Sequence, residues 1–457
     1  MVFILASLHS RGPFLSLPET PTRSVNEGVD RLRPRSHFGL VWVEQLFPPV
    51  YLFVLQLNSL TAQGDTTMTQ IPELNALGYA KSLVSVPSVS ANSNGPVSDV
   101  VESHLRSLDF QIERQEFLDP FGVPKVNIIG RKGPGAGGVA YFSHTDVVPA
   151  DTWSVTSDES FAAHGPFEPT VRNNRLYGRG SCDMKGSIAA MLAAVSRLRD
   201  ATLREPIYIV CTADEEVGFH GAKHVAESSR CYAEMVAGQS RAIIGEPTEL
   251  QVVHAHKGIY GFRATATGKA AHSSTRDGVN ANLAMIPFLA EMKAIHDETL
   301  ISPAWLDETF DPPWISWNIG INDHNRAVNI TAPQSVCSVY FRPMSGQAAD
   351  ELVHRAEAAA QRCGLKFDWE CRGLPLAGDP SCEFVRETLR LAERDASRTV
   401  GYGTDGVCFT DLKQILVLGP GSIQQAHTDD EWIGLDQLAA GTDLYEKMLR
   451  RWCVAHD

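Results

Sequence analysis

The chain has 457 residues, of which 43% are hydrophobic and 21% are charged, a composition typical of a globular protein with two or three domains. The net charge of −14 argues against a nucleic-acid or membrane-surface partner, which would favour a basic face, but it is compatible with bound metal cations. The nine cysteines form no C-x-x-C pair, which predicts reduced thiols and a cytoplasmic protein.

Residues 1–67 differ from the rest of the chain. They contain five arginines, no lysine and five acidic residues, and no helical or alternating pattern persists in them. Their most apolar segment, LFPPVYLFVLQL (46–57), has 12 residues, whereas a membrane span needs about 20. No basic residue precedes the apolar start of the chain as in a secretory signal. We therefore expect a disordered or spurious leader, followed by a folded chain that starts at residue 68 with a helix-like pattern.

Buried strands and amphipathic helices alternate in two parts of the chain, 68–257 and 373–457. The apolar runs of strand type are 139–143, 207–213, 241–245 and 415–419. A helix-like stretch, GSIAAMLAAVSRLRD (186–200), lies between the first two runs. This alternation predicts an α/β domain built on a mostly parallel sheet.

The segment 258–372 has a different pattern. It contains a strand, a helix, two strands, a helix and a strand, in that order. The order βαββαβ is that of a ferredoxin-like domain, whose helices cover one face of an antiparallel sheet. We therefore expect an inserted domain at 258–372, after which the chain returns to the α/β domain.

Ionisable residues follow the apolar runs of the α/β parts. They are His144 and Asp146, Asp183, Asp214–Glu216, Glu246 and His427. Taken singly, a histidine is more often a surface or core residue than a ligand and an acidic pair is usually solvated, while Asp183 is equally a candidate helix N-cap. Together they are expected at one edge of the sheet, where open α/β sheets bind ligands. Histidine and carboxylate ligands suit zinc, and cobalt or manganese less selectively, and the charges balance two divalent ions.

Six segments identify a family resemblance that covers about residues 70–450. They are SHTDVVPAD, RLYGRGSCDMKGSIAAML, CTADEEVGFHGAKH, IIGEPTE, KGIYGFRATATGKAAHSS and GPGSIQQAHTDDE. In this order they resemble the dinuclear zinc hydrolases that include acetylornithine deacetylase, succinyl-diaminopimelate desuccinylase, aminoacylase and glutamate carboxypeptidase. The resemblance implies a catalytic α/β domain with an inserted lid or dimerisation domain, and two Zn²⁺ per subunit.

The resemblance also implies which residues hold the metal ions. His144 and Glu246 would bind one zinc, Glu216 and His427 the other, and Asp183 would bridge both. Family members commonly have a cis peptide after the bridging Asp, here Asp183–Met184. Asp146 would orient the His144 ring through the second ring nitrogen.

Further roles follow from the resemblance for residues that act on the substrate. Glu215 would be the general base that passes a proton to the leaving amine, and His272 in GKAAH would donate to the oxyanion, in dimeric members at the partner's site. Arg342 and Asn329 would contact the substrate, as would the backbone of Gly421 and Ser422. Without the resemblance, His272 would be interpreted as a polar loop residue, and Arg342 would equally be a surface arginine on an edge strand.

The segment GPGSIQQAHTDDEW favours the acetylornithine deacetylase branch, and hence deacetylation of N2-acetylornithine to ornithine and acetate in arginine biosynthesis. Residues 401–409, GYGTDGVCF, depart from that branch, which often has Thr-Glu-Ala there. The alternatives are a desuccinylase, a carboxypeptidase or dipeptidase, and a non-catalytic binding protein, although the last should have lost Glu215 or a ligand. We expect a small N-acyl amino acid as substrate and a homodimer formed through the inserted domain, without nucleic-acid or membrane partners.

Overall fold

The structure is a computed structural model that describes residues 75–154, 164–325 and 327–455. The expected leader, 1–67, and the expected start of the fold at 68 lie outside these residues. Within the described part of the chain, no helix combines the length and the hydropathy that a membrane span requires.

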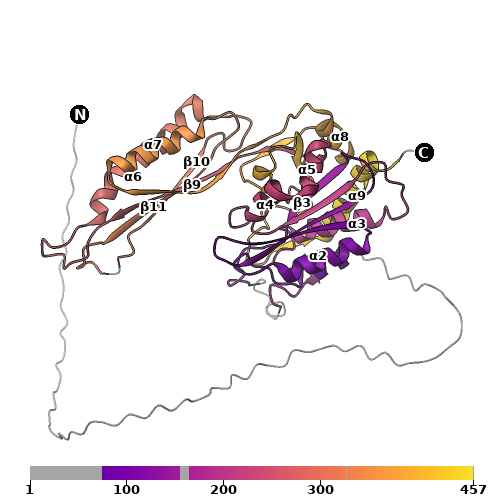
Figure 1. The fold of residues 1–457 in the computed structure, drawn as a ribbon, viewed down its shortest axis with the longest axis horizontal. Coiled ribbons are helices and arrows are strands. Elements are labelled where there is room, and N and C mark those ends of the chain that lie inside the picture. The colour runs from indigo at the N-terminus through magenta and orange to yellow at the C-terminus, as the bar shows by residue number, and fades with distance from the viewer. Residues whose placement is uncertain (1–74, 155–163, 326, 456–457) are drawn as a thin grey trace, which may run out of the picture. The chain divides into compact units, whose positions relative to one another are not determined.

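A nine-stranded sheet forms the centre of the α/β part (Figure 1). Its order is β1-β2-β6-β3-β7-β15-β8-β13, and β14 pairs with β8. The strands are β1 (Gln111–Leu118), β2 (Pro124–Lys132), β3 (Val139–His144), β6 (Ile207–Thr212), β7 (Arg241–Ile244), β8 (Val253–His256), β13 (Leu376–Ala377), β14 (Arg398–Val400) and β15 (Gln414–Val417). The four runs predicted from the sequence are the adjacent parallel strands β6, β3, β7 and β15.

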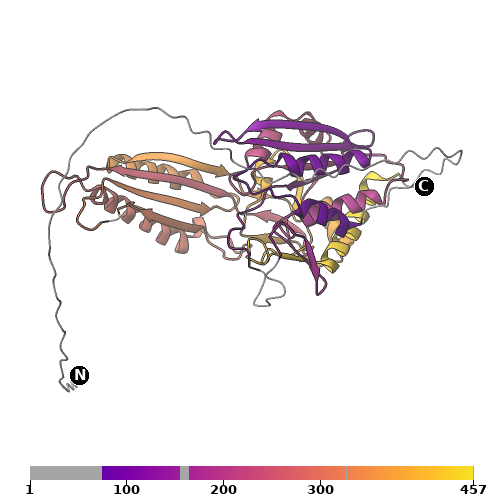
Figure 2. The ribbon, with the colours of Figure 1, turned by 90° about the horizontal axis from the view of Figure 1, so that it is seen from below.

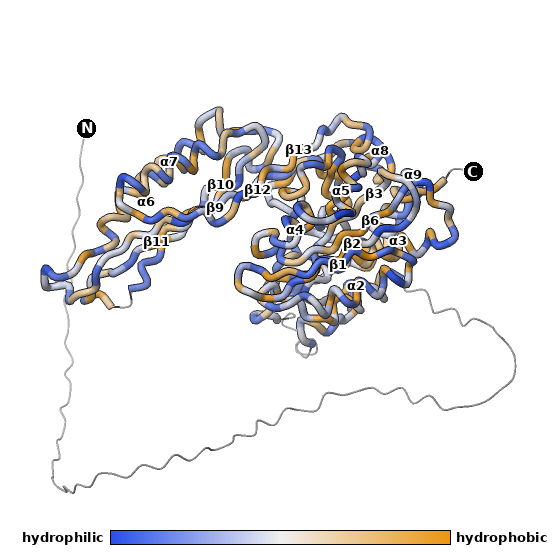
Figure 3. The backbone as a smooth tube through the Cα atoms, in the orientation of Figure 1, coloured by the Kyte–Doolittle hydropathy of each residue, from blue (hydrophilic) through white to orange (hydrophobic). Residues whose placement is uncertain are grey.

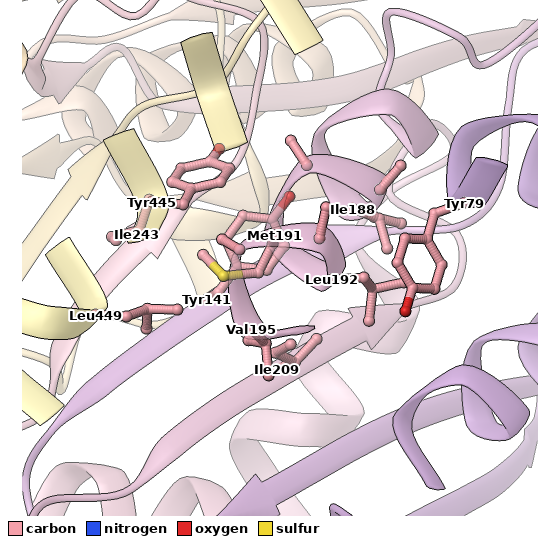
Figure 4. Packing of buried hydrophobic residues seen from close by; sticks show 14 of the residues in the cluster. Tyr79, Tyr141, Ile188, Met191, Leu192, Val195, Ile209, Ile243, Tyr445 and Leu449 are labelled. Atoms are coloured by element: carbon pink, nitrogen blue, oxygen red, sulfur yellow. The ribbon is translucent and has the colours of Figure 1, made fainter. Parts of the chain in front are cut away.

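Helices cover both faces of this sheet, which explains why its central strands β3 and β6 are buried at every position and mostly apolar (Figure 3). One face packs against α1 (Ala76–Val84), α2 (Gly95–Ser107), α3 (Lys185–Ser196), α8 (Glu383–Ala392) and α9 (Leu435–Cys453). There Tyr141 from β3 and Ile209 from β6 meet Met191 of α3 and Tyr445 of α9 (Figure 4). The other face packs against α4 (His220–Ser228), α5 (Arg230–Ala237) and the 3-10 helix η2 (Asp405–Cys408).

The inserted region has the expected βαββαβ order. Its elements are β9 (Ile259–Thr267), α6 (Ala281–Ile301), the 3-10 helix η1 (Pro303–Trp305), β10 (Ser316–Asn322), β11 (Gln334–Arg342), α7 (Ala349–Arg362) and β12 (Lys366–Gly373). The antiparallel sheet has the order β10-β11-β9-β12, which is the ferredoxin-like arrangement. Helices α6 and α7 lie side by side on one face of it (Figures 1 and 2). The predicted fold class is confirmed.

A small third sheet joins two segments that are far apart in the sequence. It consists of β4 (Thr170–Arg172), β5 (Arg175–Tyr177) and β16 (Trp432–Gly434). The antiparallel pairing of β16 with β5 sets Trp432 opposite Tyr177. This pairing brings the turn before α3 next to the segment that follows His427.

Candidate metal centre

Five predicted ligand residues meet at the carboxyl edge of the parallel strands. His144 ends β3, Glu216 and Glu246 follow β6 and β7, and Asp183 precedes α3. The Nε2 atom of His144 lies 3.1 Å from Oδ1 of Asp183 and 3.7 Å from Oε1 of Glu246. The Nε2 atom of His427 lies 3.3 Å from Oδ2 of Asp183 and 3.0 Å from Oε1 of Glu216.

These distances divide the cluster into two groups that share Asp183. One carboxylate oxygen of Asp183 faces His144 and the other faces His427. Single ligand atoms of His144, Asp183 and Glu216 all lie within 4.8 Å of one another. The donor set of imidazole and carboxylate, without cysteine, suits Zn²⁺, Co²⁺ or Mn²⁺. The arrangement therefore fits two divalent cations with Asp183 between them.

The electrostatics of the cluster also favour bound positive charge. Hydrogen bonds to Asp183 and Glu216 raise the pKa of His427 to about 10. Burial alone would lower the pKa of His144, but its hydrogen bond to Asp183 and the charge of Glu246 raise it well above the usual value. Burial raises the pKa of Glu246, and the charge of Asp183 acts in the same direction. Crowded carboxylates of this kind are stabilised as anions by divalent cations.

The His144 ring is held at its second nitrogen by the backbone of Asp146. Its Nδ1 atom lies 2.9 Å from the backbone oxygen of Asp146, whereas the Asp146 carboxylate is 3.6 Å away. A carbonyl acceptor requires the proton on Nδ1, which leaves the Nε2 lone pair free for a metal ion. The carboxylate of Asp146 instead accepts the backbone N–H groups of Glu215 and Glu216, at 3.1 and 3.3 Å.

The turn that carries Glu215 and Glu216 is anchored by a buried ion pair. Asp214 has a positive φ of 59° and is fully buried. One of its carboxylate oxygens lies 2.6 Å from Nζ of Lys125, which is 1% exposed and also donates to the backbone oxygens of Ser90 and Asn92. Asp214 therefore supports the turn, and the sequence pattern gave no signal for its partner Lys125.

Glu215 is half-buried beside the cluster. Among the described residues, no hydrogen bond or ion pair joins its side chain to a histidine. Burial raises its pKa well above the ordinary value, and the negative charges of Glu246 and Glu216 add to this effect. A carboxyl group with a raised pKa accepts a proton more readily and is suited to proton transfer.

The Asp183 turn needs an unusual backbone. The Asp183–Met184 peptide is cis, as expected from the resemblance. Gly180 has a φ of +83°, and a Cβ there would lie 2.8 Å from Val147. Glu431, for which the sequence pattern predicts no role, accepts backbone N–H groups of this turn.

A cleft of about 470 Å³ opens beside the cluster. Glu215 lines it from the α/β part, and Arg342 and Tyr340 of β11 line it from the inserted region. Arg342 is half-buried and its Nη1 atom has no hydrogen-bond partner among the described residues. Tyr402 of the departing segment 401–409 also lines the cleft.

The other predicted substrate contacts lie outside this cleft. His272 is exposed and pairs with Ile330 in an isolated bridge, and its Nδ1 atom is 2.7 Å from Oγ of Ser274. Asn329 is exposed on the neighbouring loop. The N–H of Gly421 donates to Gln437, and the Ser422 oxygen accepts from Cys182. The structure thus brings Arg342, but not these four residues, to the cleft of its own chain.

Comparisons with known proteins place the chain in a family. The model of peptidase family M20/M25/M40 matches residues 140–451, and the chain belongs to this family of metallopeptidases and amidohydrolases. It is 31% identical to the acetylornithine deacetylase of Proteus mirabilis over 82% of this chain and 96% of the relative. It is 32% identical to that of Myxococcus xanthus, over 81% and 96%.

Solved structures share the fold at lower identity. The metallo-carboxypeptidase Sso-CP2 of Sulfolobus solfataricus matches with a TM-score of 0.64 at 16% identity, over 82% of this chain and 98% of that one. Human carnosine dipeptidase 1 matches with a TM-score of 0.62 at 16% identity, over 82% and 96%. The YXEP protein of Bacillus subtilis, a dinuclear metal-binding M20 peptidase, matches with a TM-score of 0.55 at 13% identity, over 82% and 96%.

Proposed function

We propose that the protein is a metal-dependent amidohydrolase that converts N2-acetylornithine to ornithine and acetate in arginine biosynthesis, in the cytoplasm. The observation that carries the proposal is the pair of histidine–carboxylate groups sharing Asp183, with Glu215 beside them in the cleft. The relatives that are 31% and 32% identical over most of their length support the acetylornithine substrate.

The proposed metal ions are two Zn²⁺, with Co²⁺ or Mn²⁺ as substitutes. His144 and Glu246 would hold one ion and Glu216 and His427 the other, with Asp183 shared. Two divalent cations would polarise the substrate carbonyl and lower the pKa of a bound water.

Side chains of the protein would carry out proton transfer, substrate binding and oxyanion stabilisation. Glu215 takes the proton of the attacking water and gives it to the leaving amine, for which its raised pKa is suited. Arg342 binds the substrate carboxylate through its unpartnered N–H groups. His272 donates to the oxyanion, and Asn329, Gly421 and Ser422 are proposed as further substrate contacts.

We place His272 in the active site of a second copy, in a homodimer formed through the inserted domain (258–372). Two observations support this proposal. His272 and Asn329 are exposed and do not line the cleft of their own chain. Edge strand β10 and helix α6 also expose large apolar side chains, with Ile321, Leu283 and Ile286 61%, 68% and 59% exposed. Residues 68–257 and 373–457 would form the catalytic domain.

A desuccinylase is the second candidate, because a second cation lines the cleft. Lys223 of α4 lies there together with Arg342. A substrate with a further carboxylate, such as succinyl-diaminopimelate, would gain from this charge. A carboxypeptidase or dipeptidase activity is the remaining alternative within the family.

The test is a hydrolysis panel with N2-acetylornithine, succinyl-diaminopimelate and simple dipeptides, each with added Zn²⁺ or Co²⁺. We expect the highest kcat/KM for N2-acetylornithine. Preference for succinyl-diaminopimelate would replace the proposed substrate but keep the reaction class. No hydrolysis of any of them, together with no bound metal by elemental analysis, would overturn the proposal.

A further inference from the structure

Glu431 makes an unusual set of contacts directly behind the candidate metal centre. The residue is 1% exposed. Its Oε1 atom accepts the backbone N–H groups of Cys182 and Asp183, at 2.8 and 2.9 Å. Its Oε2 atom accepts the N–H of Gly180 and a guanidinium N–H of Arg179, both at 2.9 Å. One buried carboxylate therefore holds most of the turn that presents Asp183.

Its position follows from the small third sheet. Glu431 directly precedes β16, which pairs with β5, and β5 leads into the Asp183 turn. The backbone oxygen of Glu431 accepts the N–H of Gly178 at 3.1 Å. The Glu431 side chain thus extends the backbone hydrogen bonding of this sheet into the Asp183 turn. Arg179 lies 2.9 Å from the Glu431 carboxylate and offsets its buried charge.

A second carboxylate holds the turn that carries Glu215 and Glu216 in the same way. The Asp146 carboxylate accepts the N–H groups of Glu215 and Glu216. Asp146 lies two residues after His144, and Glu431 lies four residues after His427. Each histidine segment therefore carries a carboxylate that fixes the backbone of another ligand's turn.

We propose that Glu431 is a positioning residue of the metal centre. It orients the Gly180–Asp183 backbone so that the two oxygens of Asp183 face His144 and His427 at the same time. This inference rests on the proposed function, because it takes Asp183 as the ligand shared by two metal ions. Residues behind metal ligands typically change metal affinity by about 10–100-fold when they are substituted.

The experiment compares Glu431→Gln with a matched control, Glu113→Gln. Glu113 on β1 also accepts two consecutive backbone N–H groups, those of Arg230 and Cys231 at 3.2 and 3.0 Å, but it contacts none of the ligand turns. Zn²⁺ dissociation constants are measured by chelator competition, the Co²⁺ absorption spectrum is recorded, and Tm is measured with EDTA. Glu431→Asp serves as a second variant, which keeps the charge but is one methylene too short to reach all four donors.

We expect Glu431→Gln to weaken Zn²⁺ binding by about 10–100-fold and to alter the Co²⁺ spectrum, while Glu113→Gln keeps the wild-type affinity and spectrum. Should Glu431→Gln not fold, Glu431→Asp is expected to show the same direction of change. Wild-type metal affinity in the folded Glu431 variants, or an equal loss in Glu113→Gln, overturns the positioning role. A wild-type protein that binds no divalent ion would instead show that the proposed metal-dependent function is wrong.

Discussion

The two larger sheets of the molecule present functional side chains in different ways. At the edge of the parallel strands, Nε2 of His144 lies 3.1 Å from Asp183 and 3.7 Å from Glu246, and all three residues are almost completely buried. In the antiparallel sheet of the inserted region, Arg342 reaches the cleft but His272 is exposed on a loop. A parallel sheet collects strand ends at one edge, whereas an antiparallel sheet sends alternate strands and their loops to opposite ends.

The difference has a consequence for function. The first group is fixed by burial and by backbone contacts such as those of Asp146 and Glu431. In the second group, His272 lies on an exposed loop and can act on a substrate only where another protein surface contacts that loop. Substitutions at the carboxyl edge of the parallel strands should therefore change proton transfer or metal content within one chain. Substitutions in the inserted region should change substrate binding or the contribution of a second copy.

The largest expected effect is that of Glu215→Gln. The variant keeps the shape of the side chain but removes the base, so kcat should fall by about 10²–10⁴-fold. Metal content should stay at the wild-type level, because Glu215 is not one of the five clustered ligand residues. The measurements are kcat on the preferred substrate and elemental analysis of zinc. As a control, exposed Glu116→Gln on β1 should change neither, and an active Glu215→Gln enzyme would remove Glu215 as the base.

The next effect tests whether the inserted region acts in a second copy. His272→Ala should lower kcat by about 10²–10³-fold, because the oxyanion loses a donor. Mixing inactive His272→Ala with inactive Glu215→Gln, after subunit exchange, should restore about a quarter of wild-type activity, since each mixed dimer then has one complete site. Mixtures that stay inactive despite demonstrated exchange would place His272 in its own chain's site or outside catalysis.

The central strands and the meeting of the five candidate ligand residues could be predicted from the sequence for definite reasons. The four apolar runs are buried on both faces, so their composition identifies them as β3, β6, β7 and β15 without an alternating pattern. His144, Glu216 and Glu246 lie at or shortly after strand ends, Asp183 precedes a helix and His427 follows the last apolar run. The family resemblance implied which metal ion each of them would bind. The structure brings all five together.

The supporting contacts could not be predicted, because they join distant segments through side chain and backbone. Glu431 reaches a turn about 250 positions earlier, and its acidic neighbours in HTDDEW make it look like a solvated residue. Lys125 lies in β2, where a lysine suggests an exposed position, yet it pairs with buried Asp214. A prediction from local pattern assigns such residues to the surface, since only the folded chain shows what they contact.

A smaller effect is expected from Arg342→Lys in the inserted region. Lysine keeps the charge but not the two parallel N–H donors, so KM should rise by about 10–100-fold with a smaller change in kcat. Arg372→Lys on β12 is the control, because Arg372 forms a two-point contact with Asp350 and does not line the cleft. Steady-state kinetics on the preferred substrate separate the two parameters. An unchanged KM with a lowered kcat would mean that Arg342 acts on the transition state and not on substrate binding.

The last prediction concerns the end of β8, shortly before β9 of the antiparallel sheet begins, and it concerns stability and not catalysis. His256 ends β8, is fully buried, and contacts the backbone oxygen of Lys257 and the hydroxyl of Thr404. Burial lowers its pKa from 6.5 to about 4. Between these two pH values the unfolded chain binds a proton at this residue and the folded chain does not, so the free energy of unfolding falls as the pH drops, by about 3 kcal/mol near pH 4.

His256→Gln removes this titration while it keeps a polar side chain of similar size. The variant should be less stable than wild type at pH 7.5, because the packing around Thr404 changes, and the gap should narrow by up to about 3 kcal/mol as the pH falls to 4. Urea unfolding at pH steps, with EDTA in every sample so that metal release does not contribute, measures both curves. Curves that stay parallel from pH 7.5 to 4 would show that the folded protein accepts the proton on His256, and that the end of β8 opens to water more readily than its burial indicates.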